Sequence, residues 1–357
     1  MKRMILFFFL FVPFVVRTQP GYVIVTKNIN DFSPKEIEKS KAFNYSYYRC
    51  TYIIDATSDL SKLNNLQSLR QVDLIVSLDS LPKELYFLSD SLKEITIDGG
   101  NKLTKISSLG SLKNLESISI RHFAGTDLPE LNQLTKLKSL SIWGDYYNDE
   151  NKLKHINEIT NCKSLRNLEI RYVSLDTLDL DMSRMNIESL AISSRFLKNI
   201  DAISGSKSLK HLQLYWAQIE KLPRKMGNME NLESIDFAYM DRLKNISNLK
   251  KMKNLHMLFI RDACNLSEIP KSFNTNLNIE NIRIELRQNN SFVAEGLTQL
   301  KKLKSLSLEY LPQTFLLPKN FTTCENLENV VFIQVGANSL RNQITIKTLP
   351  KLKKLTL

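Results

Sequence analysis

The chain has 357 residues, a length that fits about two globular domains or one elongated array of repeats. It is 43% hydrophobic and 24% charged, with only 10 Gly and 10 Pro, which excludes a disordered chain, a collagen and a polytopic membrane protein. Lysine and arginine outnumber the acidic residues by 49 to 37, a net charge of +12, and four cysteines are too few for a disulfide-dense scaffold.

The first 18 residues have the layout of a secretory signal peptide. Lys2 and Arg3 precede a twelve-residue apolar run, residues 5–16, that is broken only by Pro13. This run is shorter than the roughly 20 residues that cross a bilayer, so export is favoured over the alternative, a signal anchor. Removal of residues 1–18 leaves 46 basic residues against 37 acidic ones, a charge of +9. We therefore predict a secreted or extracytoplasmic protein, periplasmic or on the cell surface, with no membrane span after signal removal.

Residues 19–60 form a segment that lacks the repeat found in the rest of the chain. The sequence predicts short strands at Tyr22–Thr26 and Thr51–Ile54, and a helix start at Ser33–Glu36. A stack of repeats exposes an apolar end, which an atypical first segment usually covers. We therefore interpret residues 19–60 as an N-terminal cap and residues 61–357 as the repeat domain.

A triplet of apolar residues, spaced by two residues and then by one, recurs thirteen times. All 39 slots of the pattern are apolar, and successive copies start 22 to 25 residues apart, with a single spacing of 28. Such a regular period indicates one structural unit per repeat, stacked on its neighbours. The thirteen triplets are Leu69-Val72-Leu74, Leu92-Ile95-Ile97, Leu115-Ile118-Ile120, Leu137-Leu140-Ile142, Leu165-Leu168-Ile170, Ile187-Leu190-Ile192, Leu209-Leu212-Leu214, Leu232-Ile235-Phe237, Leu255-Leu258-Ile260, Ile279-Ile282-Ile284, Leu303-Leu306-Leu308, Leu327-Val330-Phe332 and Leu352-Leu355-Leu357.

Each unit is predicted to contain a strand, a turn and a short helix or helical turn. The last two apolar slots alternate with polar residues, which is typical of a strand with one buried face. Five repeats then carry a Leu-Pro or Ile-Pro pair, and proline is tolerated in the first turn of a helix. After Pro223, for example, Met226, Met229 and Leu232 follow at helical spacing.

These features resemble the leucine-rich repeat family, whose pattern is L-x-x-L-x-L-x-x-N/C-x-L. The Leu-Pro pairs and the 23 to 24 residue period are similar to the plant disease-resistance style of repeat. The resemblance implies an α/β fold, a horseshoe-shaped solenoid of about 13 repeats with a parallel concave sheet and short convex helices. One departure is that the Asn slot of the family pattern holds Asn101 but elsewhere residues such as Val173 and Ala217. The turn backbone must then find other hydrogen-bond partners, or the turns are looser.

The 28-residue spacing arises from an insertion at residues 143–152, which is rich in aromatic and acidic residues. We expect it to leave the stack as a loop at the C-terminal side of a strand. A ligand contact and a tolerated insertion are equally consistent with it. At the other end of the chain, Lys351, Lys353 and Lys354 are expected to protect the last strand from edge-to-edge pairing. The alternatives are that the sequence is truncated there or that this end meets a partner.

The sequence carries no recognisable constellation for catalysis, for a metal or for a cofactor. The four histidines are scattered, and there is no HExxH, P-loop or GxSxG motif. Cys162 and Cys324 share one repeat slot, seven repeats apart, and are predicted to be small hydrophobic residues of the convex side rather than a disulfide. We therefore expect a protein that is not an enzyme.

The concave face is the candidate binding surface, because side chains that flank the buried slots point into the hollow of the horseshoe. Both tryptophans of the chain fall there, together with arginines and tyrosines, the residue types that dominate binding hot spots. The alternative is that aromatic residues are simply common on strands. The candidate binding residues are Arg121, Trp143, Arg171, Tyr172, Tyr215, Trp216, Tyr239, Phe259 and Arg261.

The leading hypothesis is an exported, non-enzymatic module that binds a protein or peptide through its concave face. The alternative is a surface adhesin or a polysaccharide or polyanion binder, suggested by the charge of +9; carbohydrate is therefore an alternative ligand. Export makes nucleic acid an unexpected partner. Many of the basic residues are assigned to convex helical turns, where charges are usually solvated; they include Lys136, Lys138, Lys251, Lys253, Lys301 and Lys302.

Overall fold

The computed structural model describes residues 22–31, 47–67, 69–128, 131–146, 152–154, 156–273, 277–287, 291–312, 315, 317–318, 321–333 and 349–356. The proposed signal peptide and the helix start at Ser33–Glu36 lie outside these residues. Within them, no helix is long and apolar enough to cross a membrane.

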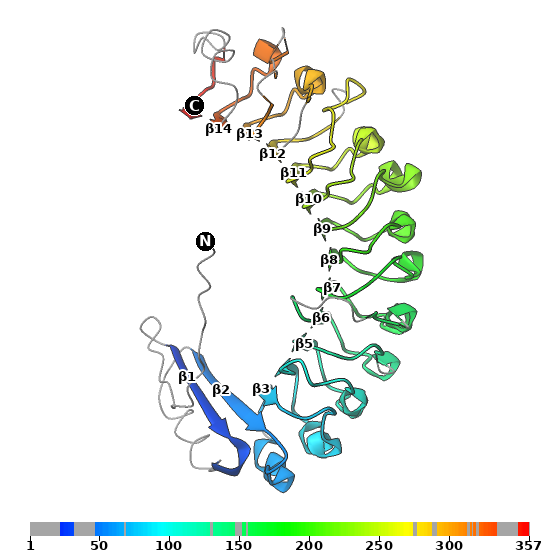
Figure 1. Ribbon diagram of the computed structural model, residues 1–357, viewed down its shortest axis with the longest axis vertical. Coiled ribbons are helices and arrows are strands. Elements are labelled where there is room, and N and C mark those ends of the chain that lie inside the picture. The colour runs from blue at the N-terminus through cyan, green and yellow to red at the C-terminus, as the bar shows by residue number, and fades with distance from the viewer. Residues whose placement is uncertain are drawn as a thin grey trace, which may run out of the picture.

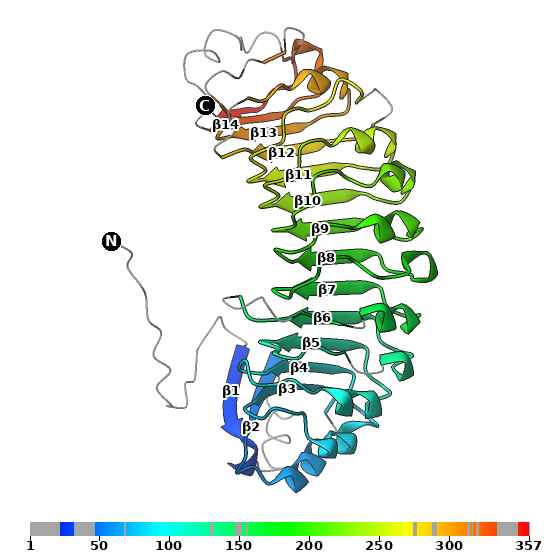
Figure 2. The same ribbon diagram turned by 45° about the vertical axis from the view of Figure 1, so that its right-hand side comes forward.

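The described residues form one open, all-parallel sheet whose fifteen strands follow each other in chain order. The sheet lines the inside of a curved solenoid, and helical turns cover its outside (Figures 1 and 2). The horseshoe predicted from the repeat is therefore confirmed. The strands are β1 (Tyr22–Asn28), β2 (Tyr47–Ile54), β3 (Gln71–Val76), β4 (Glu94–Asp98), β5 (Ser117–Arg121), β6 (Ser139–Trp143), β7 (Asn167–Arg171), β8 (Ser189–Ser193), β9 (His211–Tyr215), β10 (Ser234–Ala238), β11 (Met257–Arg261), β12 (Asn281–Glu285), β13 (Ser305–Glu309), β14 (Asn329–Ile333) and β15 (Lys354–Thr356).

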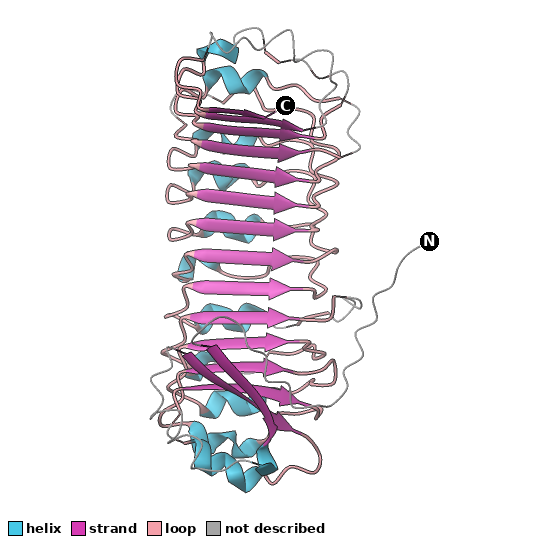
Figure 3. Ribbon diagram, turned by 90° about the vertical axis from the view of Figure 1, so that its left-hand side faces the viewer, coloured by secondary structure: helices cyan, strands magenta, loops and turns pink. Residues whose placement is uncertain are grey.

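The two strands predicted in residues 19–60 are present as β1 and β2, and β2 pairs in parallel with β3. Figure 3 shows that β1 and β2, at the start of the sheet, are tilted relative to the later strands, which run nearly side by side. The role of this segment as a cap stays a prediction.

The convex elements are short 3₁₀ helices, in agreement with the expected short helices or helical turns. Pro82 and Pro223 stand one residue before a helix, at its N-cap, rather than in its first turn. The described helices are η1 (Ile29–Asp31), η2 (Leu60–Leu66), η3 (Lys83–Leu88), η4 (Ser107–Ser111), η5 (Leu131–Gln133), η6 (Ile156–Asn161), η7 (Met182–Arg184), η8 (Asp201–Gly205), η9 (Arg224–Asn228), η10 (Ser247–Lys251), η11 (Glu295–Gln299) and η12 (Phe321–Thr323).

One continuous hydrophobic core runs through the solenoid between the sheet and the helices. The aliphatic triplets supply its strand side: Leu115, Ile118 and Ile120, for example, are completely buried. Cys162 and Cys324 are also buried, with free thiols, as the repeat phase predicts. Because each repeat contacts mainly its neighbours, the stack positions side chains of successive strands at a constant spacing of about 4.8 Å.

Backbone groups of the turns, where the family Asn is mostly missing, bond to the next repeat instead. The N–H groups of Tyr172 and Trp216 donate to the carbonyl oxygens of Ser193 and Ala238, at 3.0 and 2.9 Å. A second series of hydrogen bonds between repeats lies at the N-terminal side of the strands. It is formed by asparagines that directly precede the first aliphatic residue of the triplet. The side-chain amides of Asn114, Asn231, Asn254 and Asn326 each donate to a backbone carbonyl of the preceding repeat.

Charged residues of opposite sign also link the repeats, at the position just before the strands; we call this series the charge column. The Nζ atoms of Lys93 and Lys138 both lie 2.6 Å from the carboxylate of Glu116. Further ion pairs of the column join Lys210 to Glu188, Lys304 to Glu280 and Lys353 to Glu328, each at 2.8 Å. The assignment of Lys138 to a convex helical turn was therefore wrong, because it directly precedes β6 and is paired.

Candidate binding surface on the concave face

The nine predicted binding residues occupy three positions relative to the strands. Five of them, Arg121, Trp143, Arg171, Tyr215 and Arg261, are the last residues of β5, β6, β7, β9 and β11. Three more, Tyr172, Trp216 and Tyr239, are the first residues after β7, β9 and β10. Phe259 is the middle residue of β11 and is half-buried. The first eight are joined by ring contacts, whereas none of the ring contacts among the described residues includes Phe259.

Arginine and aromatic side chains alternate along the strand ends from β5 to β11. The guanidinium groups of Arg121 and Arg171 lie 5.9 and 5.6 Å from the ring centroid of Trp143. The guanidinium groups of Arg171 and Arg261 lie 4.9 and 5.9 Å from the ring centroid of Tyr215. Each cation–π contact contributes about 0.5–1 kcal/mol at an exposed site and more when it is desolvated. These contacts therefore restrain the conformations of the arginine and aromatic side chains in the absence of a ligand.

Small residues on the intervening strands allow these long side chains to meet. In the register of the sheet, Ser193 on β8 lies between Arg171 and Tyr215, and it is only 1% exposed. Ala238 on β10 lies between Tyr215 and Arg261 in the same way and is also 1% exposed. The small residues at these strand ends are therefore part of the support for the surface rather than part of the surface.

Polar side chains in the middle of the strands fix the arginines and the tyrosine. Arg171 bonds to Glu169, and its Nη2 donates to Oε1 of Gln213 at 3.3 Å. The Asp236 carboxylate accepts bonds from the Tyr215 hydroxyl at 2.9 Å and from Nη2 of Arg261 at 2.8 Å. Burial, with the nearby Asp236 charge, raises the pKa of Tyr215 above its usual value. Tyr215 thus stays a hydrogen-bond donor throughout the physiological pH range.

A contiguous group of aromatic rings follows the C-terminal ends of β6 to β10; we call Trp143, Tyr146, Tyr172, Trp216 and Tyr239 the aromatic edge. Tyr172 packs edge-on against Trp143 and Tyr146, with ring centroids 6.1 and 5.1 Å apart. Trp216 lies 5.7 Å from both Tyr146 and Tyr172 and stacks on Tyr239 at 5.1 Å, with the planes 18° apart. Offset and edge-on contacts of this kind are favourable for aromatic rings.

Three members of the aromatic edge have a left-handed backbone. The φ angles of Tyr172, Trp216 and Tyr239 are 56°, 58° and 55°. This conformation is rare for bulky residues and costs about 1–2 kcal/mol per residue. The same turn recurs at His122 and Tyr310, with φ of 51° and 54°. The aromatic edge is therefore built on a strained turn that recurs directly after several strands.

Three residues at or beside the aromatic edge were not among the nine predicted binding residues: Tyr146, Arg195 and Phe196. Tyr146 is 44% exposed and comes from the insertion that begins at Trp143, for which the sequence left a ligand contact and a tolerated insertion equally open. Arg195 lies 6.0 Å from the ring centroid of Trp216, and Phe196 beside it is 38% exposed. Tyr239 is 45% exposed. Three of the six exposed large hydrophobic side chains in the described part of the chain therefore lie after β6, β8 and β10.

A second group of charges on β12 and β13 is neutralised internally. Nε of Arg283 lies 3.0 Å from Glu309, and Arg287 lies 2.7 Å from Glu285 and 3.3 Å from Asp262. Glu285 and Glu309 are each 6% exposed, and burial, with the charge of Glu285, raises the pKa of Asp262. These carboxylates are covered by arginines. Within the described residues, no group of three or more His, Cys, Asp or Glu side chains is arranged to hold a metal ion.

No protein-family model matches the sequence, and no curated protein is detectably similar to it. Solved structures with a similar fold include an internalin (inlF) from Listeria monocytogenes, with 18% identity, 94% of this chain and 86% of that chain covered, and a TM-score of 0.54. The receptor of the PEPR1–AtPEP1 complex is 19% identical, with 94% and 47% covered and a TM-score of 0.55. The receptor of the TLR13–ssRNA13 complex is 17% identical, with 86% and 43% covered and a TM-score of 0.58.

This chain spans less than half of the two receptor chains, and at these identities the likeness concerns the fold alone. The likeness agrees with the aliphatic triplets and with their thirteen parallel strands, β3 to β15. The chain is therefore a leucine-rich repeat solenoid.

Proposed function

We propose that this protein is an exported, non-enzymatic recognition module that binds a protein or peptide through the concave face and the aromatic edge. The observation that supports it best is the unbroken contact series from Arg121 to Arg261, with the exposed rings of Tyr146 and Tyr239 beside it. Tryptophan, tyrosine and arginine dominate binding hot spots because they bury a large area and still make hydrogen bonds.

The arrangement lowers the entropic cost of binding. Immobilising a side chain with many rotamers at an interface costs about 0.5–1.5 kcal/mol. Arg171 and Arg261 are already held by Glu169 and Asp236, so a partner meets side chains whose positions are set. Six strand spacings from β5 to β11, each about 4.8 Å, span roughly 29 Å. This length suits a standard interface of about 800 Å² per partner.

The internalin and receptor folds are consistent with a scaffold for recognition, but what those proteins bind stays a property of those proteins. The proposal therefore depends on the side chains of this chain. Export rests on the first 18 residues of the sequence, and mass spectrometry of the N-terminus of the native protein tests it. A mature chain that still begins at Met1 would contradict export with signal removal.

The test of the binding face is a triple variant, Tyr172→Ala, Trp216→Ala and Tyr239→Ala, used to capture partners from the native environment. Loss of three hot-spot rings should weaken binding at least about a hundredfold, equivalent to roughly 3 kcal/mol. The matched control is Tyr86→Ala, because Tyr86 is 52% exposed but lies on the convex helix η3. Equal capture by the folded triple variant and by the wild type would refute the assignment of the face.

A further inference from the structure

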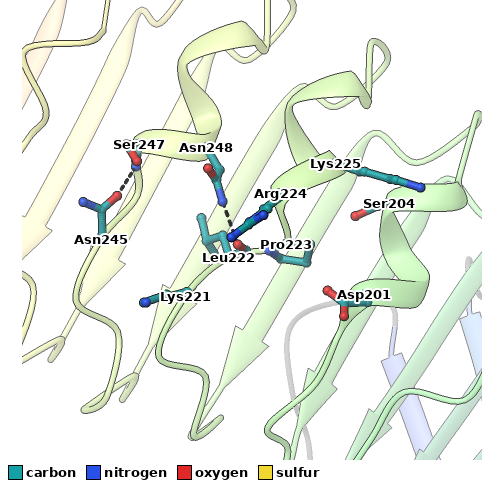
Figure 4. Close-up of a pocket in the computed structure, with 10 residues that line it drawn as sticks. All are labelled: Asp201, Ser204, Lys221, Leu222, Pro223, Arg224, Lys225, Asn245, Ser247 and Asn248. Atoms are coloured by element: carbon teal, nitrogen blue, oxygen red, sulfur yellow. Dashed lines mark hydrogen bonds between the residues drawn. The ribbon is translucent and has the colours of Figure 1, made fainter.

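Two hollows on the convex side flank the helical turn η9. The first has a volume of about 780 Å³ and lies among η8, η9 and η10. The second, of about 520 Å³, lies at the C-terminal ends of η9 and η10. Figure 4 shows the first hollow, whose lining comes from three successive repeats. We call the two hollows together the convex cleft.

The floor of the convex cleft is held by short-range contacts. The side-chain amide of Asn248 donates to the carbonyl oxygen of Leu222 at 2.7 Å, and Oδ1 of Asn245 accepts from the N–H of Ser247 at 2.6 Å (Figure 4). Gly227 lets η10 approach η9 closely, because a Cβ there would lie 2.9 Å from the carbonyl oxygen of Asn248. The cleft is therefore a fixed feature of the stack.

The lining of the convex cleft is strongly basic. Lys221, Arg224 and Lys225 line the first hollow with one acidic residue, Asp201. Three more lysines line the second hollow with one acidic residue, Glu230; they are Lys250, Lys251 and Lys253. None of these six cations forms an ion pair with any described residue, in contrast to the paired lysines of the charge column. Six cations against two acidic residues give the lining of the convex cleft an excess of four positive charges.

The uncharged residues that line the two hollows favour one class of polyanion, a charged glycan, over another, a nucleic acid. Asn245, Ser247 and Asn248 in the first hollow, and Asn228 and Asn254 in the second, offer amide and hydroxyl groups. Sugar hydroxyl groups pair with such side chains. Single-stranded nucleic acid is usually bound by aromatic side chains on which bases stack, and no aromatic residue lines either hollow. Cations next to amides and hydroxyls therefore favour a charged glycan over a nucleic acid.

We propose that the convex cleft binds an anionic polysaccharide, with sulfate or carboxylate groups on the six cations and sugar hydroxyls on the amides. This site is separate from the concave face, so a glycan and a protein partner would bind at the same time. The cations would displace the counterions of the polyanion, and binding would weaken as the salt concentration rises.

The test uses a heparin decasaccharide as the probe, at about 0.15 M salt. Replacing Lys221, Arg224 and Lys225 together by Gln should lower the affinity about tenfold or more, and the same change at Lys250, Lys251 and Lys253 should do likewise. The matched control replaces Lys83, Lys113 and Lys302 by Gln, which removes equal charge from exposed positions in or beside other helical turns. We expect less than about a threefold loss there.

An equal loss in the control would overturn the proposal, because it would show a diffuse response to net charge. An affinity for a single-stranded oligonucleotide of equal charge that matches the affinity for the decasaccharide would overturn the choice of a glycan. Unchanged binding in both cleft variants, with thermal unfolding confirming that they are folded, would also overturn it. The triple variant of the aromatic edge should bind the probe like the wild type, which separates this test from that of the concave face.

Discussion

The guanidinium of Arg171 lies 4.9 Å from the ring centroid of Tyr215, and Ser193 on the strand between them is almost completely buried. The contact thus spans two strand spacings and depends on a small residue in the middle. Ser193 also has a hydroxyl oxygen that is buried and bonded to no described residue. This arrangement makes Ser193 the position where the geometry of the concave face can be changed without removing any proposed binding residue.

We predict that two substitutions at Ser193 differ strongly in their effect on stability. Ser193→Phe should push Arg171 and Tyr215 apart and reduce the free energy of unfolding by about 1–3 kcal/mol, because it overpacks the space between them. Ser193→Ala removes an unbonded hydroxyl and should change stability by less than about 0.5 kcal/mol. Urea unfolding measures both. A stable Ser193→Phe variant that still captures its partner would contradict the bridging role of Arg171 and Tyr215.

Gly144 should be intolerant of a side chain, because a Cβ there would collide with the carbonyl oxygen of Tyr172. The collision would displace the turn that carries Tyr172 in the aromatic edge. We expect Gly144→Ala to cost about 1–3 kcal/mol of stability and to weaken partner capture. Gly205→Ala is the control, since the nearest atom to its added Cβ would be 3.4 Å away. Thermal unfolding of the two variants should separate them; similar melting temperatures would refute the close approach.

The charge column should make stability depend on pH in the acidic range. Lys138 and Lys93 lower the pKa of Glu116 from 4.5 to about 2. Because the folded pKa lies below the unfolded one, the stabilisation is fully present above about pH 4.5 and is lost as the pH falls towards 2. Lys138→Gln should raise the pKa of Glu116, as followed by NMR titration of its carboxyl group.

Lys136→Gln is the matched control for this titration. Nζ of Lys136 bonds to Oδ1 of Asn114 at 2.6 Å and not to Glu116, so its loss should leave the Glu116 titration in place. A Glu116 carboxyl that titrates near 4.5 in the wild type would show that the column is not formed in solution.

The buried cysteines should be inert in the folded protein. Burial raises the pKa of Cys162 and of Cys324 to about 11, and the thiolate is the reactive form. In a Cys50→Ser background at pH 8, a maleimide should label Cys264 first, because it is the only one of the three described thiols that is partly exposed. Mass spectrometry counts the labels. Labelling of Cys162 or Cys324 without denaturant would contradict their place in the core.

The fold was predictable because its signal is repeated. Each of the thirteen apolar triplets identifies the core-facing side of one strand. A wrong strand assignment in one repeat would be evident from comparison with the other twelve. The positions of Trp143, Arg171 and Tyr215 at the strand ends followed from the alternation of side chains along a strand. The sequence shows directly that most repeats lack the Asn of the family pattern. Backbone hydrogen bonds between neighbouring repeats take its place, because the repeats stack closely.

The details of the binding surface were not predictable, because they depend on contacts between repeats. Nothing in the pattern around Tyr239 indicates a left-handed φ, since bulky residues rarely adopt it. The alternation of Lys93, Glu116 and Lys138 is visible only when repeats are aligned at a slot outside the aliphatic triplet. The convex cleft likewise arises from three neighbouring turns and has no local motif.

The most direct test of the proposed binding face places a photo-crosslinking amino acid at Tyr239 or at Tyr86, two exposed aromatic positions on opposite sides of the solenoid. Irradiation in the native environment, followed by mass spectrometry, identifies the chain in contact with each position. We expect one discrete protein or peptide adduct from position 239 and none from position 86. Adducts from position 86 alone, or the same adducts from both, would contradict recognition through the concave face.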